Sequence, residues 1–454
     1  MKILMLGWEY PPLITGGLAT ATEGLVNGLI ALGHEVTLVL PYFPFRVRKH
    51  GLTIVSPERP IGFDALEDSR TIALEKEYEE LQGLVRGNLS HWKSHYEYRL
   101  MSDWAGGGEG SLEDEDVVAK IKLREIEVRS RAGSDTAVST PMFHTMEEKA
   151  FVLGVLASQL VSDQKFDVVH ANDWMTFPAL DVLKSRTQIP IVAQVHSTEY
   201  DRAGENGNQK IIDIERRGVT IADHIITVSR YTKSILIQRF GVPESKIEVA
   251  YNAANEQHGN NGNNEQNTNN NEAPSDETDP VVTFVGRITF QKGPAYFVHA
   301  AELVLRTNPR VRFRVVGTGD LLASMKQLVW ELGIDKSFSF DGFLDAQQVQ
   351  EVLADSSIFV MPSVSEPFGI VALEAVQQNI PVIISKQSGV SEVLPNALKV
   401  DFWDTELMAD RILSLLKYRK IRHELVENSQ KDLLRRTWYQ AAKKCQDAYR
   451  KAQG

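Results

Sequence analysis

The pattern of hydrophobic positions changes twice along the first 40 residues of the chain. Lys2–Leu6 is a short apolar run typical of a buried strand, and residues 18–32 carry apolar side chains at helical spacing. Gly33 stands where a helix C-cap belongs, and residues 34–40 return to the alternation of a strand. Strand, helix and strand in this order predict a βαβ unit and therefore a parallel sheet.

The same rhythm returns after residue 145 and again after residue 280. Helical spacing covers residues 211–222, and a last helix, Trp438–Ala452, places its apolar side chains on one face. Residues 43–145 show no clear pattern, and we expect a long insertion there. The expected strands lie at residues 166–170, 191–196, 224–228, 281–285, 313–316, 337–340, 358–361 and 382–384.

Residues 255–279 separate the two series of strands. They are rich in asparagine and hold no apolar cluster that could offset the entropy cost of ordering them, which predicts a linker or loop. We therefore expect an α/β protein with two Rossmann-like domains, at residues 1–254 and 280–430, facing each other across a cleft. Residues 431–454 contain the final helix.

Composition narrows the class of protein. The 454 residues carry a formal net charge of −11, which argues against broad nucleic-acid binding. The single cysteine, Cys445, excludes an intrachain disulfide. No run approaches the roughly 18 apolar residues that a membrane span needs, and the first apolar run is too short for a signal peptide. We expect a cytoplasmic protein that is not integral to a membrane.

The strongest motif is PSVSEPFGIVALE at residues 362–374, directly after the expected strand Ile358–Met361. It opens a helix, and a proline is expected at the first helical position. The free amides of Phe368, Gly369 and Ile370 would then face the cleft and form an anion site suited to a diphosphate.

Two glutamates belong to the same string. Glu366 precedes the helix and Glu374 is expected about two turns into it, so both can face one ligand. The alternative for Glu366 alone is an ordinary helix start with a solvent-facing glutamate.

A second motif places Arg287 and Lys292 five residues apart, at the end of the strand Val281–Val285. Ligands of open α/β sheets bind at the carboxyl ends of strands, and two cations there suit a leaving diphosphate, whose negative charge grows as the sugar bond breaks. The alternative is two solvated surface charges.

Other candidate residues carry less information on their own. Gly16 and Gly17 match neither dinucleotide nor P-loop spacing, and Gly317 is equally weak alone. His196 ends one expected strand, and Asp173 follows the preceding strand, so the two can line the same cleft. A lone histidine is more often structural than catalytic.

One acidic string has the DxD spacing of metal-dependent glycosyltransferases, at Asp114-Glu115-Asp116. No apolar strand places it, so we interpret it as a solvated face and expect no catalytic metal.

Together these strings resemble the retaining GT-B glycosyltransferases of family 4 and the related bacterial glycogen and starch synthases. The most specific part is the E-x7-E segment from Glu366 to Glu374, with Pro-Phe-Gly after the first glutamate. Arg287 and Lys292 match the family's diphosphate-binding pair. The resemblance spans nearly the whole chain outside the long insertion and the asparagine-rich segment.

The resemblance implies a role for each of these residues. Glu366 would contact hydroxyl groups of the donor sugar, and Glu374 would contact the ribose of the nucleotide. Arg287 and Lys292 would stabilise the leaving diphosphate, and His196 would lie beside the reacting sugar. The family needs no metal and retains anomeric configuration, with the donor phosphate helping to accept the proton of the acceptor.

Further parts of the chain match the family or depart from it. Gly16-Gly17 matches the glycine loop that closes on the donor, and the last helix resembles one that crosses back to the first domain. Asn172 stands where histidine is common, and Ile14 stands where glycogen synthases carry a lysine.

The resemblance therefore implies a hexosyltransferase with a nucleotide-sugar-binding C-terminal domain and an acceptor-side N-terminal domain. Its substrates would be a nucleotide-diphosphate sugar, with glucose as the expected hexose, and a carbohydrate acceptor such as a glucan. No other cofactor is expected. The alternatives are a nucleotide-sugar epimerase and a non-catalytic sugar-binding module. A dehydrogenase is disfavoured because the glycine fingerprint is missing.

Overall fold

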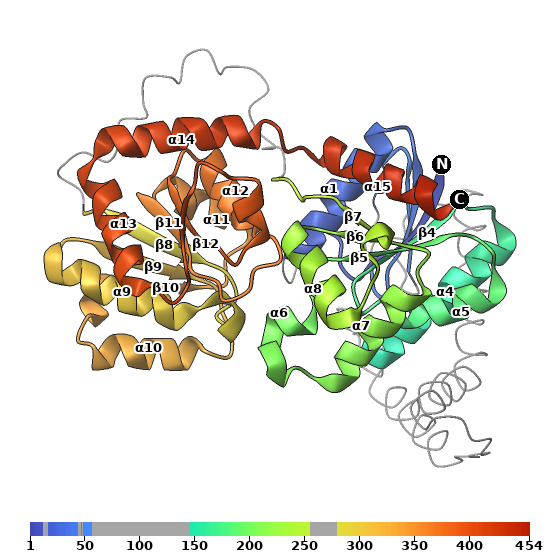
Figure 1. Ribbon diagram of the computed structural model, residues 1–454, viewed down its shortest axis with the longest axis horizontal. Coiled ribbons are helices and arrows are strands. Elements are labelled where there is room, and N and C mark those ends of the chain that lie inside the picture. The colour runs from blue at the N-terminus through green and yellow to red at the C-terminus, as the bar shows by residue number, and fades with distance from the viewer. Residues whose placement is uncertain (12–16, 44–46, 48, 57–145, 255–278) are drawn as a thin grey trace, which may run out of the picture.

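The computed structural model describes residues 1–11, 17–43, 47, 49–56, 146–254 and 279–454, and it contains two parallel sheets with helices around them (Figure 1). The expected α/β class with two Rossmann-like halves is confirmed. The insertion expected at residues 43–145 falls almost entirely outside the described residues, as does the asparagine-rich segment.

The first sheet has seven parallel strands in the order β3-β2-β1-β4-β5-β6-β7. The strands are β1 Lys2–Leu6, β2 Glu35–Val39, β3 Leu52–Val55, β4 Val168–Asn172, β5 Ile191–Val195, β6 His224–Thr227 and β7 Ile247–Val249. One prediction needs correction, because β4 begins two residues later than expected and runs on to Asn172. Its pairing with β1 starts at Val168, opposite Ile3.

Helices cover both faces of this sheet. The side chains of Leu4 and Leu6 pack into one core and those of Ile3 and Met5 into the other, as the alternation of a strand requires. A strand buried on both faces explains the continuous apolar run at the start of the chain. The helices are α1 Gly17–Ala31, α4 Met146–Asp163, α5 Pro178–Arg186, α6 Glu199–Ala203, α7 Gln209–Ile221 and α8 Arg230–Phe240.

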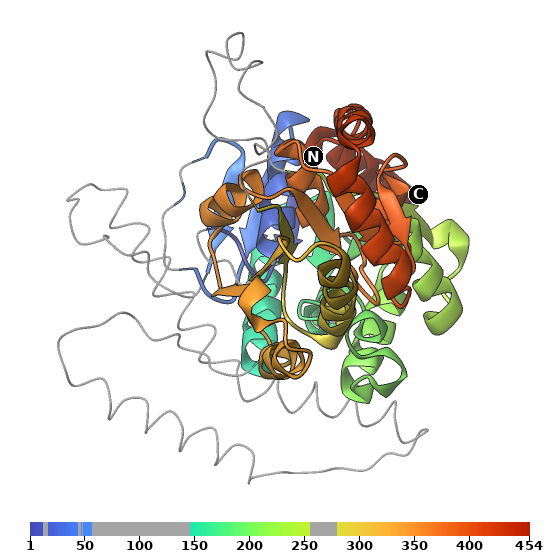
Figure 2. The ribbon, with the colours of Figure 1, turned by 90° about the vertical axis from the view of Figure 1, so that its left-hand side faces the viewer.

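The second sheet has six parallel strands in the order β10-β9-β8-β11-β12-β13, again with helices on both sides (Figure 2). The strands are β8 Val281–Val285, β9 Arg312–Val316, β10 Phe338–Gly342, β11 Ile358–Met361, β12 Val382–Ser385 and β13 Leu398–Val400. The helices are α9 Pro294–Thr307, α10 Leu322–Glu331, α11 Ala346–Ala354, α12 Ile370–Gln377, α13 Thr405–Lys417 and α14 Arg419–Leu433.

Each sheet contains one point where the order of its strands reverses. In the first sheet this point lies between β1 and β4, and in the second it lies between β8 and β11. Connections leave for opposite faces of the sheet on the two sides of such a point, so a crevice forms at the carboxyl ends of the two strands. The motif loops predicted to bind the donor follow β8 and β11.

The last helix, α15 Trp438–Ala452, leaves the second domain and packs on α1 of the first, as expected (Figure 1). Its buried side chains are those predicted from its apolar face, including Ala442 and Tyr449. Trp438 lies directly over α1, because a Cβ atom added at Gly24 would stand 2.0 Å from its ring and one at Gly28 would stand 2.3 Å from its carbonyl oxygen. These two glycines allow the helices to approach closely.

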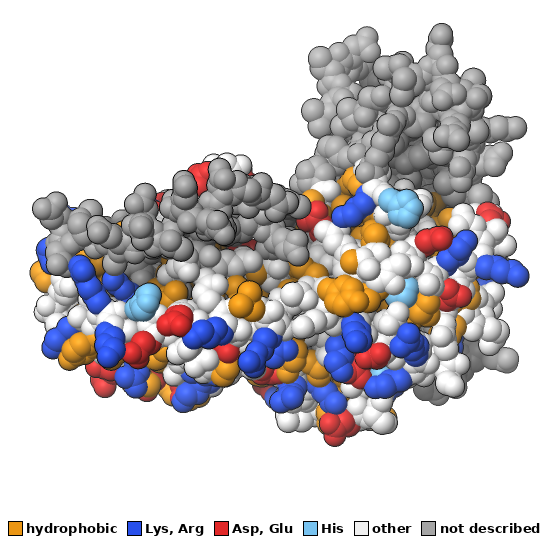
Figure 3. Space-filling view, turned by 90° about the horizontal axis from the view of Figure 1, so that it is seen from above, with side chains coloured by type: hydrophobic (Ala, Val, Ile, Leu, Met, Phe, Trp, Pro, Cys, Tyr) orange, Lys and Arg blue, Asp and Glu red, His pale blue; other side chains and the backbone are white. Residues whose placement is uncertain are grey.

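Seen from above, the molecule presents basic side chains mixed with acidic and apolar ones rather than a continuous patch of one sign (Figure 3). Exposed apolar side chains on the α14 and α15 segments include those of Ile421 and Tyr439. None of the helices in the described part of the chain is long and apolar enough to cross a membrane.

Candidate functional site

Two loops meet at the reversal point of the second sheet. The loop after β8 contains the short 3-10 helix η4, Phe290–Lys292, and its Gln291 carbonyl accepts a hydrogen bond of 2.9 Å from the amide of Val364 in the loop after β11. Gly293 has φ 65°, and a Cβ atom there would stand 2.1 Å from the carbonyl oxygen of Pro362. Glycine therefore permits the backbone contact that brings the two predicted motifs together.

An ion pair joins the two motifs. Lys292 Nζ lies 2.5 Å from Glu366 Oε2, and the side chain of Glu366 is only 8% exposed. The hydroxyl of Ser363 donates to the same carboxylate oxygen at 3.2 Å. A buried carboxylate needs such compensation, because an unpaired buried charge costs several kcal/mol. The predicted residues Glu366 and Lys292 thus form one unit.

The backbone of Glu366 is held as firmly as its side chain. Its amide donates to the carbonyl of Gln387 at 2.9 Å, and its own carbonyl accepts from the amide of Gly389 at 2.9 Å, in an isolated parallel bridge. The carboxylate therefore has a defined position relative to the strands on either side.

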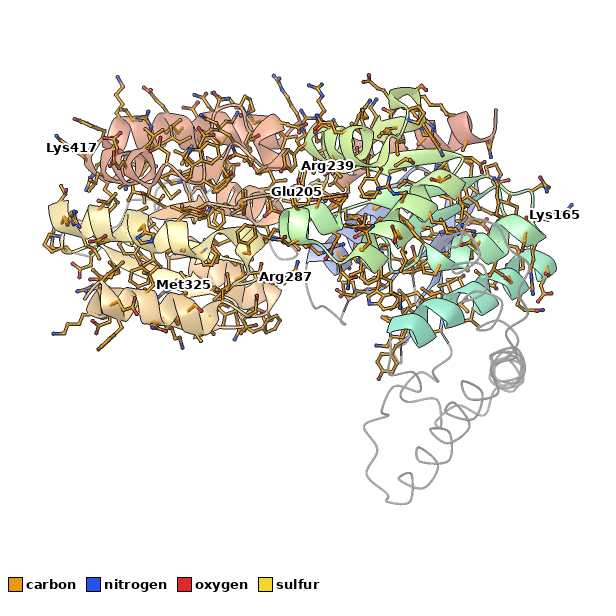
Figure 4. The ribbon with its side chains drawn as sticks, turned by 60° about the horizontal axis from the view of Figure 1, so that its bottom comes forward. Lys165, Glu205, Arg239, Arg287, Met325 and Lys417 are labelled. Atoms are coloured by element: carbon orange, nitrogen blue, oxygen red, sulfur yellow. The ribbon has the colours of Figure 1, made fainter. Side chains whose placement is uncertain are left out.

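Arg287 is not a member of this ion pair. It is exposed, lies two residues after the end of β8, and sits at the end of the C-terminal domain that faces the N-terminal domain (Figure 4). No ion pair is found for it within the described residues, so its guanidinium is available to an anionic ligand. Gly317 lies beneath this loop, since a Cβ atom at Gly317 would stand 2.0 Å from the carbonyl oxygen of Gly286.

The helix after β11 begins later than predicted. α12 starts at Ile370 with Gly369 as its N-cap at φ 101°, so Pro367 does not occupy the first helical position. The reason is that the carbonyl of Phe368 accepts a hydrogen bond from the amide of Val390 at 2.7 Å, which holds residues 366–368 in extended pairing. The first amides of α12 still have no partner within the helix. The Phe368 side chain is buried, so its backbone alone can contact a ligand.

Glu374 consequently lies about one turn into α12 rather than two. Its side chain is half-buried, and burial raises the pKa of its carboxyl from 4.5 to about 7. The carboxyl is thus partly protonated near neutral pH, and it can either donate or accept a hydrogen bond.

In the first domain, Asp173 organises the loops at the carboxyl ends of β4 and β5. This residue adopts φ 58°, a left-handed conformation that aspartate tolerates better than most residues. Its carboxylate accepts hydrogen bonds from the amides of His196 at 2.6 Å and Ser197 at 3.4 Å. Burial raises the pKa of Asp173 to about 6, although the two amides and nearby Arg202 oppose the shift. Asp173 therefore shapes the loop that carries His196.

His196 follows β5 and is partly buried. Its Nε2 atom lies 3.1 Å from Oδ1 of Asn172, the last residue of β4. Burial lowers the pKa of its imidazole to about 4, so the ring is neutral at physiological pH. A neutral imidazole with so low a pKa is a hydrogen-bonding group rather than an effective general base.

The two domains contact each other through side chains next to the predicted site. Ser365, which precedes Glu366, donates a hydrogen bond of 2.6 Å to Asp201 in α6, and its hydroxyl lies 2.9 Å from that of Tyr231 in α8. Glu392 of the second domain accepts hydrogen bonds from the Tyr231 amide at 2.8 Å and the Tyr251 hydroxyl at 2.9 Å. Contacts between the domains thus begin one residue away from the ion pair.

The structure brings four of the residues proposed from sequence into two contacting pairs. Glu366 and Lys292 are in contact, and Asp173 binds the amide of His196. Gly17 begins α1 on the connection that leaves β1, the neighbour of β4. Gly16 and the Asp114–Asp116 string lie outside the described residues.

Three residues that join the domains were not predicted from the sequence: Asp201, Tyr231 and Glu392. Thr198 and Asp201 form a capping box at the start of α6, and that spacing could have predicted the helix. No local pattern marks Glu392, because its partners lie more than 140 positions away along the chain.

Within the described ranges, no three His, Cys, Asp or Glu side chains are grouped as a metal ion would require. That the reaction needs no metal stays a prediction.

Three family models match successive parts of the chain. The model described as "Starch synthase catalytic domain" matches residues 2–87, "Glycosyltransferase Family 4" matches residues 120–258, and "Glycosyl transferases group 1" matches residues 265–432. The last range includes both motif loops at the reversal point of the second sheet.

Individual relatives agree with these matches. An uncharacterized glycosyltransferase of Methanocaldococcus jannaschii is 28% identical, with 99% of this chain and 98% of that protein covered. A glycogen synthase of Mycobacterium tuberculosis is 25% identical, with 87% of this chain and 80% of that protein covered. The fold is similar to that of a sucrose-phosphate synthase from Thermosynechococcus elongatus, with a TM-score of 0.65, 16% identity, and 99% of this chain and 98% of that chain covered.

The raised pKa of Glu374 predicts a pH-dependent stability. A carboxyl whose pKa rises from 4.5 to about 7 on folding stabilises the fold fully below pH 4.5, and this contribution is lost as the pH rises through 7. Glu374→Gln keeps the group neutral, so it should raise the free energy of unfolding at pH 8 by up to about 3 kcal/mol and change it little at pH 4.5.

Urea unfolding at both pH values measures this difference. Glu424→Gln, at an exposed position of α14, is the control and should change stability little at either pH. An equal effect of Glu374→Gln at pH 4.5 and pH 8 would show that Glu374 does not titrate in this way.

Proposed function

We propose that this chain, a glycosyltransferase of the GT-B fold related to the glycogen synthases, transfers a hexosyl group from a nucleotide-diphosphate sugar to a carbohydrate acceptor. The observation that carries this proposal is the buried ion pair between Lys292 and Glu366, which joins two strand-end loops beside the exposed Arg287. These groups combine a hydroxyl-binding carboxylate with two cations at a place where α/β sheets bind ligands.

The cations suit the nucleotide end of the donor. Negative charge grows on the diphosphate as the bond to the sugar breaks, and positioned cations stabilise that charge most in the transition state. Among the residues that the structure describes, Arg287 has no ion-pair partner, whereas Lys292 is paired with Glu366. The unpaired first amides of α12 add partial positive charge at the same sheet edge.

The two glutamates suit the sugars of the donor. The carboxylate of Glu366 is oriented by Lys292 and Ser363, which leaves its remaining acceptor positions for hydroxyl groups of the hexose. Glu374, one turn into α12, is placed to bind the ribose hydroxyls. Its pKa of about 7 allows it to accept or donate there.

We further propose that the hexose is glucose, the acceptor a glucan, and the anomeric configuration retained. The match of residues 2–87 to a starch synthase catalytic domain and the glycogen synthase relative support the first two points. The low pKa of His196, about 4, makes it a weak base, which supports an oxygen of the leaving diphosphate as the acceptor of the proton. The single, buried Cys445 fits a reaction in the cytoplasm.

The first test is thermal unfolding with a panel of nucleotide-diphosphate sugars and free nucleoside diphosphates, without added metal. One donor should stabilise the protein, by about 2.7 kcal/mol at 100 times its dissociation constant. Arg287→Ala should lose most of this effect, whereas Arg310→Ala, at an exposed position on the same domain, should keep it. Stabilisation by no member of the panel would contradict the proposal and favour a sugar-binding module.

Turnover tests the ion pair itself. Lys292→Ala should lower kcat by roughly 100-fold or more, as the loss of a group that stabilises transition-state charge does. Glu366→Ala should lower kcat to a similar extent, because it removes both the acceptor for the hexose hydroxyls and the partner that orients Lys292. Lys292→Ala also leaves a buried carboxylate unpaired, so rates are normalised to folded protein and measured well below its melting temperature. Lys417→Ala, at the far end of the domain, is the control (Figure 4). Isomerisation of the donor without an acceptor would favour an epimerase instead.

A further inference from the structure

His196 is linked to a network of buried hydrogen bonds. Asn172 lies at its centre and is 1% exposed. The Asn172 Oδ1 atom lies 3.1 Å from His196 Nε2 and 3.3 Å from His170 Nε2, and its Nδ2 group donates to the carbonyl of Leu6 at 3.0 Å. His170 and Asn172 are two residues apart on β4, so their side chains share one face of the sheet.

The partners of Asn172 determine which way its amide points. A backbone carbonyl can only accept a hydrogen bond, so the group that contacts Leu6 must be the amide nitrogen. The oxygen therefore faces the two imidazole rings. An amide oxygen also only accepts, and a neutral imidazole carries one N–H, so both rings must carry their hydrogen on Nε2.

The last helix completes the chain from the other side. The hydroxyl of Tyr449 lies 2.7 Å from His170 Nδ1, and the two rings meet edge to face at 5.7 Å. With its hydrogen on Nε2, His170 has a lone pair on Nδ1 and accepts this hydrogen bond. Burial raises the pKa of the Tyr449 hydroxyl well above its ordinary value, so the hydroxyl remains a donor.

We infer that Asn172, held by Leu6 and supported by His170 and Tyr449, is a positioning residue that fixes His196 as the Nε2–H tautomer. His196 then offers the Nδ1 lone pair as its only acceptor, and that acceptor suits a hydroxyl group of a hexose. This assignment of the acceptor rests on the proposed transferase function, whereas the tautomer itself does not depend on it.

Asparagine is suited to this role in a way that a titrating side chain is not. A histidine at position 172 could donate or accept and could change with pH, whereas the amide keeps its acceptor oxygen at all physiological pH values. Tyr449 lies on α15, so the helix that returns from the second domain also supports the ring that shares Asn172 with His196.

The tautomer can be measured without any substrate. The full-length chain is labelled with 15N at the histidine rings, and long-range 1H–15N correlation spectra distinguish Nε2–H from Nδ1–H imidazole. His170→Gln and His196→Gln assign the two rings among the 11 histidines. We expect the Nε2–H pattern for both rings in the wild-type protein. An Nδ1–H pattern for His196 would overturn the proposal, whatever the enzyme transfers.

Two variants test the positioning. Asn172→Leu removes the shared acceptor, so His196 should become a mixture of tautomers and kcat should fall about tenfold, the effect of one hydrogen bond to a reacting group. The KM for the donor should change less than about twofold, because the diphosphate contacts are intact. Tyr449→Phe keeps the packing of α15 and removes only the donor to His170 Nδ1. The Nδ1 resonance of His170 should then shift while both rings stay in the Nε2–H form, because Asn172 still accepts from each. This gives a second measurement if Asn172→Leu does not fold, and a change of tautomer in this variant would contradict the proposal.

Thr283→Val is the matched control. It removes a comparably buried hydrogen bond, 2.6 Å to Ser356 in the second domain, and should leave the spectra of both rings unchanged. A wild-type His196 spectrum and a wild-type kcat in a folded Asn172→Leu protein would show that the network has only a structural role.

Discussion

The parallel direction of the strands is the constraint on which the rest of this molecule depends. Parallel strands bring their carboxyl ends to one edge of a sheet, and the reversal of strand order opens that edge to a ligand. Here β1 and β4 flank the reversal in the first sheet, and β8 and β11 flank it in the second. The hydrogen bond from Ser365 to Asp201 shows that the two edges meet. Short loops from different parts of the chain can therefore build a single site.

The site contains charged side chains that are buried from water, and ion pairs compensate their charges. Lys292 neutralises Glu366 in the second domain. In the first domain, Arg202 lies 2.8 Å from Glu199 and 2.6 Å from Glu215. Arg287 is an exposed cation for which the described residues show no ion pair, and this favours an anionic ligand over a neutral one. Because Ser365 precedes Glu366 and contacts the first domain, a ligand bound at the ion pair can influence the contact between the domains.

Much of the fold could be predicted from sequence, since β1, β8, β11 and α15 have the predicted bounds. Their hydrophobic periods are local and uninterrupted. The start of α12 was predicted wrongly, because the pairing of residues 366–368 with a segment more than 20 residues away has no local signal. The pair of Lys292 and Glu366 could be proposed from motifs, but its contact could not. The position of Asn172 between two histidines depends on side-chain geometry across β4 and β5, which no periodicity encodes.

Hexosyl transfer with retention, as proposed for this site, is tested by the anomeric configuration of the product. The protein is incubated with an α-linked nucleotide-diphosphate hexose and a glucan acceptor, and the anomeric proton of the new linkage is observed by 1H NMR. An α-linked product is the predicted result, because the leaving diphosphate and the incoming hydroxyl then share one face of the sugar. A β-linked product, or an isomerised donor with no transfer, would rule out a retaining transferase.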